Sequence, residues 1–210
     1  DTSVPGELKV SWAFDGSVPT QGWELSYTID GTPLQTLTCT DNTATLPYYP
    51  GSKYTFHVKP IENITYFGEP FTFEAPKATP FEGYLVTGSD MDFAMIVKPD
   101  AEHWDRYSLA PEDYKTKFNA DESVAFLVHL LKQYNTSEDM IVTSYIIRNH
   151  AGQPVSLNTE QRTWGDMWDG GYCHLEVPEM PTTVGEFTIE IYFNGHFVTT
   201  QEFSIEHIAP

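Results

Sequence analysis

Basic residues and cysteines are both scarce in this sequence. It has 11 Lys and Arg against 30 Asp and Glu among its 210 residues, a formal net charge of -19. Binding to nucleic acids or to anionic membranes needs Lys and Arg clustered on one surface, so the composition argues against both partners. The two cysteines, Cys39 and Cys173, are too few to build a disulfide framework or a metal site by themselves. We expect both thiols to be unpaired.

Long hydrophobic runs are also missing. The longest strongly apolar stretch, residues 124–131, is interrupted by His129, so the sequence predicts no membrane span. Apolar residues nevertheless make up 40% of the chain and aromatic residues 14%, enough for a packed globular core. We expect any export signal or lipid anchor to lie outside this segment.

Apolar residues rarely recur with the helical period of 3.6 residues. Apolar and polar residues alternate instead. In the first part of the chain it occurs at residues 8–12, 23–27 and 54–58. Such alternation is typical of strands with one buried face. Asp30-Gly31 and Pro50-Gly51 lie between these runs and favour turns, the first suiting a tight hairpin.

Residues 7–77 resemble a fibronectin type III domain. The similarity is carried by the runs LKVSW, WELSY and PGSKYTFHV, with Leu46 before the third and FTFE supplying a last strand. In that family an early tryptophan fills the core and a tyrosine after the Pro-Gly turn makes a corner hydrogen bond. The resemblance places these roles on Trp12 and Tyr54. No Arg-Gly-Asp tripeptide is present, so integrin-type adhesion is not implied.

Two prolines and small residues at 75–80 interrupt the alternation and indicate an interdomain junction. We therefore divide the chain into domains at 1–77 and 78–210. In the second domain, alternating runs at 185–193 and 197–205 flank Asn194-Gly195, a strong hairpin signal. Residues 140–148 and 153–157 form a second hairpin candidate.

Residues 124–131 fit either a helical face or a strand face. The β-branched and aromatic content favours a strand, although Asp121-Glu122-Ser123 could cap a helix. Gly185, Phe187, Tyr192 and Gly195 follow a Gly-x-Phe/Tyr-x-x-x-x-Tyr-x-x-Gly hairpin pattern. With this final hairpin, residues 80–210 resemble the immunoglobulin-like β-sandwich domains at the C-termini of bacterial secreted and lipid-anchored surface proteins. The predicted fold is therefore all-β, with two tandem β-sandwiches, fibronectin type III-like and then immunoglobulin-like.

Motifs for catalysis or metal binding are missing as well. There is no nucleophile elbow, no phosphate-binding glycine loop and no zinc motif, and the seven histidines lack metal-ligand spacing. Asp90 and Asp92 could offer two carboxylates to calcium, but a solvated strand face is the favoured interpretation. We predict no catalytic residue, no metal site, no cofactor and no enzymatic activity. A hydrolase with a paired carboxylate site is the less favoured alternative.

The 164–172 segment is the most suggestive cluster, because large aromatics and acids lie among glycines in what should be a loop. Trp faces can stack on sugars or on ligand side chains, and Asp side chains can accept hydrogen bonds. The candidate ligand-binding residues are Trp164, Asp166, Trp168, Asp169 and Tyr172. The competing and favoured interpretation is that the two tryptophans fold back to cap the sandwich core or the interdomain junction.

These features favour a non-enzymatic module of a bacterial extracellular or cell-envelope protein, acting as a spacer or a protein-interaction element. The alternative is a carbohydrate-binding module or an accessory domain of a glycan-degrading system. We expect a monomer whose partner is a protein or glycan at the cell surface. Residues 78–210 carry 21 acidic and seven basic residues, against nine and four in residues 1–77, so a charged partner should be basic.

Overall fold

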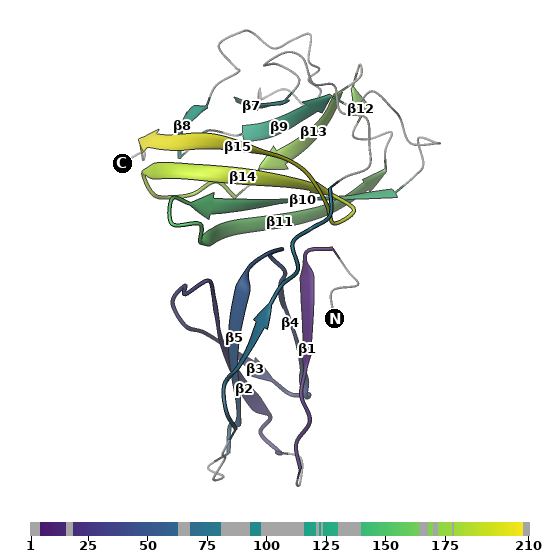
Figure 1. Ribbon diagram of the computed structural model, residues 1–210, viewed down its shortest axis with the longest axis vertical. Coiled ribbons are helices and arrows are strands. Elements are labelled where there is room, and N and C mark those ends of the chain that lie inside the picture. Colours follow the sequence, from purple (N-terminus) through teal and green to yellow (C-terminus); the bar gives the residue numbers. More distant parts are fainter. Residues whose placement is uncertain are drawn as a thin grey trace. The chain divides into compact units, whose positions relative to one another are not determined.

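The computed structural model describes residues 5–15, 19–62, 68–80, 93–97, 116–120, 122, 124–129, 140–163, 168–169, 172–177 and 179–207. Every regular element in these residues is a β-strand, which confirms the all-β prediction (Figure 1). The chain divides into two compact units, an N-terminal unit, Asp1–Ala78, and a C-terminal unit, Thr79–Pro210. Among the described residues there is no helix of the length and hydropathy needed to cross a bilayer.

The N-terminal unit is a β-sandwich of a two-stranded and a four-stranded sheet. The first sheet pairs β1 (Glu7–Ser11) with β4 (Thr43–Pro47), and the second has the order β3-β2-β5-β6. The strands of the second sheet are β2 (Trp23–Ile29), β3 (Gln35–Cys39), β5 (Lys53–Pro60) and β6 (Phe71–Glu74). All pairs are antiparallel, and the alternating residues of β1, β2 and β5 turn one side chain in two toward the core.

The tryptophan that fills this core is Trp23 and not Trp12, so the role implied by the resemblance is wrong for Trp12. Trp23 is only 2% exposed, because it lies in a central strand flanked by β3 and β5. Trp12 follows the last paired residue of β1 and is half-buried, with its ring edge-on to that of Trp23 at 6.0 Å between centroids.

The corner hydrogen bond expected of Tyr54 is confirmed. Its buried hydroxyl donates to the Pro47 carbonyl oxygen and accepts from the Tyr49 backbone N–H, each at 2.8 Å. Burial raises the pKa of the Tyr54 phenol well above its ordinary value. The Pro50-Gly51 turn directly before β5 is closed by the Ser52 N–H donating to the Tyr49 carbonyl, and its glycine has φ +77°. These contacts tie the start of β5 to the end of β4.

The C-terminal unit is a sandwich of a five-stranded and a four-stranded sheet. The larger sheet has the order β11-β10-β14-β15-β8, and the smaller has the order β12-β13-β9-β7. The larger sheet consists of β8 (Lys117–Asn119), β10 (Met140–Asn149), β11 (Pro154–Thr163), β14 (Gly185–Phe193) and β15 (His196–His207). The smaller consists of β7 (Phe93–Val97), β9 (Val124–His129), β12 (Trp168–Asp169) and β13 (Tyr172–Val177).

Both hairpins predicted in this unit are confirmed, and residues 124–129 form the predicted strand. Asn194 and Gly195 have φ +50° and +77° and join β14 directly to β15, as a type I′ turn requires. The core of the larger sheet is formed by completely or almost completely buried side chains: Tyr145, Ile147, Phe187, Ile189, Ile191, Phe193, Phe203 and Ile205. Their strand neighbours in β14 and β15, including Glu186, Thr188 and Glu202, lie on the opposite, outer face.

Candidate functional site

The predicted ligand-binding segment is only partly described by the structure. Trp168 and Asp169 form the short strand β12, which pairs with β13 at Trp168 to Cys173 and at Asp169 to Tyr172. The expectation of a loop is therefore wrong at three predicted site residues, because backbone pairing places Trp168 and Asp169 in the edge strand of the smaller sheet and Tyr172 in the neighbouring strand β13. Trp164 and Asp166 lie outside the described residues, and the ligand-binding role of the whole set stays a prediction.

The candidate calcium ligands, Asp90 and Asp92, also lie outside the described residues. In the described part of the chain, no three His, Cys, Asp or Glu side chains are grouped so that they could hold a metal ion. Cys39 is a free thiol at the end of the edge strand β3, and burial raises its pKa. A raised pKa lowers the fraction of the reactive thiolate at neutral pH.

A groove of about 620 Å³ opens on the C-terminal unit over the outer face of the five-stranded sheet. The side chains and backbone that line it come from β8, β10, β14 and β15 and from the turn after β10. The lining residues are Thr116, Lys117, Arg148, Asn149, His150, Gly152, Glu186, Phe187, Thr188, Glu190, Glu202, Phe203 and Ser204. We call this feature the sheet-face groove.

Strand register explains why these distant residues meet. Arg148 pairs with Thr188 between β10 and β14, and Thr188 pairs with Glu202 between β14 and β15. These three residues therefore form one row across the sheet. A second row begins at Glu186, which pairs with Ser204.

Lys117 of β8 completes the second row, because it pairs with Ser204 in the parallel β8–β15 ladder. The backbone supports this parallel edge with a bond from the Ser204 N–H to the Thr116 carbonyl at 2.8 Å. The short strand β8 thus forms one wall of the groove.

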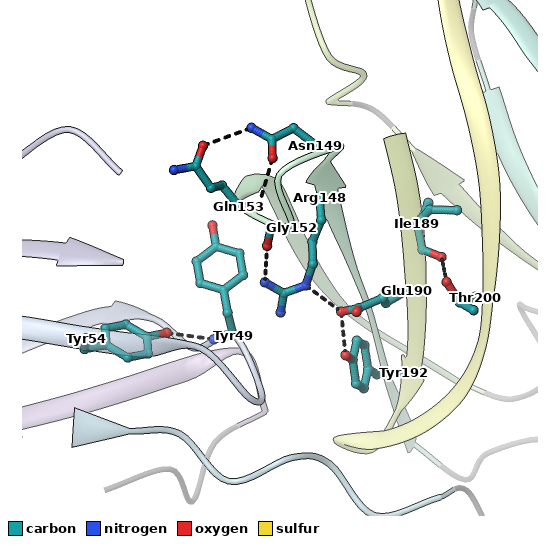
Figure 2. A network of polar contacts seen from close by, with 10 residues as sticks. All are labelled: Tyr49, Tyr54, Arg148, Asn149, Gly152, Gln153, Ile189, Glu190, Tyr192 and Thr200. Atoms are coloured by element: carbon teal, nitrogen blue, oxygen red, sulfur yellow. Dashed lines mark hydrogen bonds and ion pairs between the residues drawn. The ribbon is translucent and has the colours of Figure 1, made fainter. Parts of the chain in front are cut away.

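One side of the groove is organised by Arg148 and Glu190. The Arg148 Nε donates to the Glu190 carboxylate at 3.2 Å, and the Tyr192 hydroxyl donates to the same oxygen at 2.8 Å (Figure 2). An Arg148 terminal nitrogen also donates to the Gly152 carbonyl at 3.3 Å, which fixes the guanidinium against the turn after β10. The two charged side chains of this ion pair are only 14% and 23% exposed, so both are held in place by packing as well as by charge.

That turn is stabilised by Asn149. Its side-chain oxygen accepts from the backbone N–H groups of Ala151 and Gln153, and its amide nitrogen donates to the Gln153 side chain. Gly152 adopts φ +76°, with open space where a Cβ would lie. The turn that borders the groove is therefore shaped by its own residues and needs no ligand to form.

The remaining charged side chains of the groove differ in whether they have an ion-pair partner. Lys117 donates to Glu206 at 2.6 Å, and this hydrogen bond raises the pKa of the Lys117 ammonium. Glu186 is highly exposed, and its one ion-pair contact among the described residues is with the imidazole of His150, at 4.0 Å. Glu202 is exposed and makes no ion pair with any residue that the structure describes. Two carboxylates are thus left without a Lys or Arg partner in the described part of the molecule.

Sequence reasoning missed this groove. Its residues read locally as the polar positions of alternating strands, which is also the signature of an ordinary solvated face. Only the pairing of β10, β14, β15 and β8 brings them together, and the parallel β8–β15 ladder has no local sequence signal.

Comparison with known proteins gives little further information. No family model matches the chain, and no curated protein matches it. A solved structure described as the crystal structure of chicken CNTN1 FN1-FN3 domains matches with 12% sequence identity and a TM-score of 0.29. The match covers 96% of this chain but only 62% of that chain, so this chain spans less than two thirds of its length.

Proposed function

We propose that this chain is a non-enzymatic module of a bacterial extracellular or cell-surface protein, and that it acts as a protein-interaction element built on two rigid β-sandwiches. The bacterial origin and the location rest on the resemblance of residues 80–210 to C-terminal domains of surface proteins. A pure spacer role is the simpler form of the same proposal, in which the sandwiches only separate other parts of a longer protein.

The observation that carries the proposal is the sheet-face groove, formed by a sheet whose opposite face is a closed core. Tyr145 and Ile189 are 0% exposed beneath the groove strands, and the Tyr145 hydroxyl accepts from the Glu179 backbone N–H at 3.2 Å. A sheet fixed in this way holds its outer side chains in constant positions. Binding residues on a rigid scaffold lose little conformational entropy when a partner docks.

A protein partner fits the lining of the groove better than a saccharide does. Saccharide sites commonly offer an aromatic face for stacking. The two aromatic residues of this lining, Phe187 and Phe203, are 5% and 3% exposed and stack on each other at 5.6 Å. Charged and hydroxyl side chains are what the groove offers instead, and they suit the polar rim of a protein interface.

The carbohydrate-binding alternative depends on the 164–172 segment and not on the groove. It requires the predicted exposure of Trp164 and Trp168, which would supply the stacking faces. Because its described residues, Trp168, Asp169 and Tyr172, belong to the smaller sheet, the two functions can be separated by experiment.

The test is to probe the labelled 210-residue chain against two arrays, one of glycans and one of peptides that differ in charge. We expect binding to basic peptides that weakens with added salt, and no saturable binding to any glycan. Saturable glycan binding would support the carbohydrate-binding module, and release of reducing sugars would support the hydrolase. Either result would overturn the proposal.

A further inference from the structure

Glu186 and Glu202 occupy diagonal positions on neighbouring strands. Glu186 pairs with Ser204, Glu202 lies two residues before Ser204, and both carboxylates are on the outer face of the sheet. Diagonal neighbours of this kind are about 7–8 Å apart at their Cα atoms. Two side chains at this spacing can reach a single cation from both sides.

The other charges of the groove do not neutralise this pair. Arg148 is paired with Glu190, and Lys117 is paired with Glu206. His150 is 4.0 Å from Glu186, but its ring is 90% exposed and carries charge only when it is protonated. The groove therefore combines two filled ion pairs with two carboxylates that have no cationic Lys or Arg partner among the described residues.

From this arrangement we propose that the sheet-face groove is a docking site for a Lys- or Arg-bearing segment of a partner protein, with one cationic side chain held between Glu186 and Glu202. The proposal rests on the protein-interaction function proposed above and assigns it a place and a ligand chemistry. Thr188, which pairs with Glu202, and Ser204, which pairs with Glu186, occupy the opposite diagonal and provide hydroxyl groups that can accept further N–H donors of the same segment.

Charge complementarity is the reason to choose a basic partner. Residues 78–210 contain 21 acidic and seven basic residues, so the whole unit attracts cations at long range. The long-range field thus recruits a basic segment, and the carboxylates of Glu186 and Glu202 select where it binds.

The experiment compares two double variants of the full chain, each of which removes two negative charges. Glu186→Gln with Glu202→Gln alters the groove without changing side-chain volume. Glu69→Gln with Glu74→Gln is the matched control, because both residues are exposed and have no ion pair among the described residues. The probe is a fluorescent octalysine peptide, titrated at low ionic strength and followed by anisotropy.

We expect the groove variant to bind octalysine about fivefold to tenfold more weakly than the parent, and the control variant to stay within about twofold. Equal weakening of both variants would show that only net charge matters and would overturn the groove as the site while leaving the interaction function standing. An unchanged groove variant would have the same meaning. If the parent chain does not bind octalysine at all, both the site and the basic-partner function are wrong.

Discussion

The Tyr54 hydroxyl offers a sharp test of how the N-terminal unit is stabilised. In the variant Tyr54→Phe the ring stays, with its neighbours Phe56 and Phe73 unchanged, and only the oxygen is lost. Two hydrogen bonds of 2.8 Å disappear with it, one from the buried Tyr49 N–H and one to the Pro47 carbonyl. The orphaned N–H has no access to water and costs about 1–3 kcal/mol, whereas the carbonyl belongs to an exposed residue and costs less.

We therefore expect the free energy of unfolding of the N-terminal unit to fall by about 2 kcal/mol. This corresponds to about thirtyfold faster exchange of its most protected amide hydrogens. Hydrogen exchange with mass spectrometry on the intact chain measures this separately for β2 and β5 and for β10 and β14. The C-terminal strands should keep the parent exchange rates.

Tyr48→Phe is the matched control for this prediction. The Tyr48 hydroxyl donates to the Pro76 carbonyl at 3.2 Å in an exposed position, so its loss should cost less than about 0.5 kcal/mol. If Tyr54→Phe also costs less than about 0.5 kcal/mol, or if it accelerates exchange equally in both units, then the proposed role of the corner hydrogen bond is wrong.

Three further predictions concern pH, backbone geometry and the 164–172 segment. Burial raises the pKa of both Tyr54 and Tyr145 above 10, so their stabilisation is complete below about pH 10 and is lost as the pH rises toward the raised values. Urea unfolding should show a decline of up to about 1.4 kcal/mol per pH unit for each tyrosine, and a flat profile would contradict this. Gly22→Ala should lower the free energy of unfolding, measured with urea, by about 2 kcal/mol or more, because φ is +86° and the new Cβ would lie 2.4 Å from a carbonyl oxygen of β3. Gly31→Ala is the control: φ is +74° but the space is open, so the loss should be only about 1 kcal/mol. Equal losses for the two variants would refute the steric explanation. Trp168→Ala should abolish any ligand binding by the segment and change stability by less than about 1 kcal/mol, whereas a cost of about 3 kcal/mol or more would show a core side chain.

The parts of the fold that could be predicted are those with a strong local signal. Asn194-Gly195 between two alternating runs specified a hairpin, and the Pro50-Gly51 turn before Tyr54 specified the corner. The strands β3 and β4 were not identified as strands, because each has only five residues. QTLTC has no buried side chain, and TATLP has only two, Ala44 and Leu46, too few to establish an alternation. Both strands form because they pair with a neighbouring strand, and this pairing is not evident from their own residues.

The candidate site could not be predicted for a related reason. Sequence reasoning favoured the 164–172 segment, where aromatics, acids and glycines are adjacent in the chain. Glu186, Glu202 and Lys117 are separated along the chain and become neighbours only through strand register. The burial of Trp12 and Trp23 could not be predicted for the same reason. Both residues lie in alternating runs, and only their positions in the sheets determine which ring is buried.

The central claim, that this chain recognises a basic protein segment, is tested most directly by the salt dependence of its binding to octalysine. The dissociation constant is measured at about 20 mM and about 300 mM NaCl, with a neutral serine-glycine peptide of equal length as the control. The account predicts that affinity for octalysine falls steeply as salt screens the carboxylates and that the neutral peptide does not bind. Equal affinity for octalysine at both ionic strengths, or equal affinity for the two peptides, would contradict it.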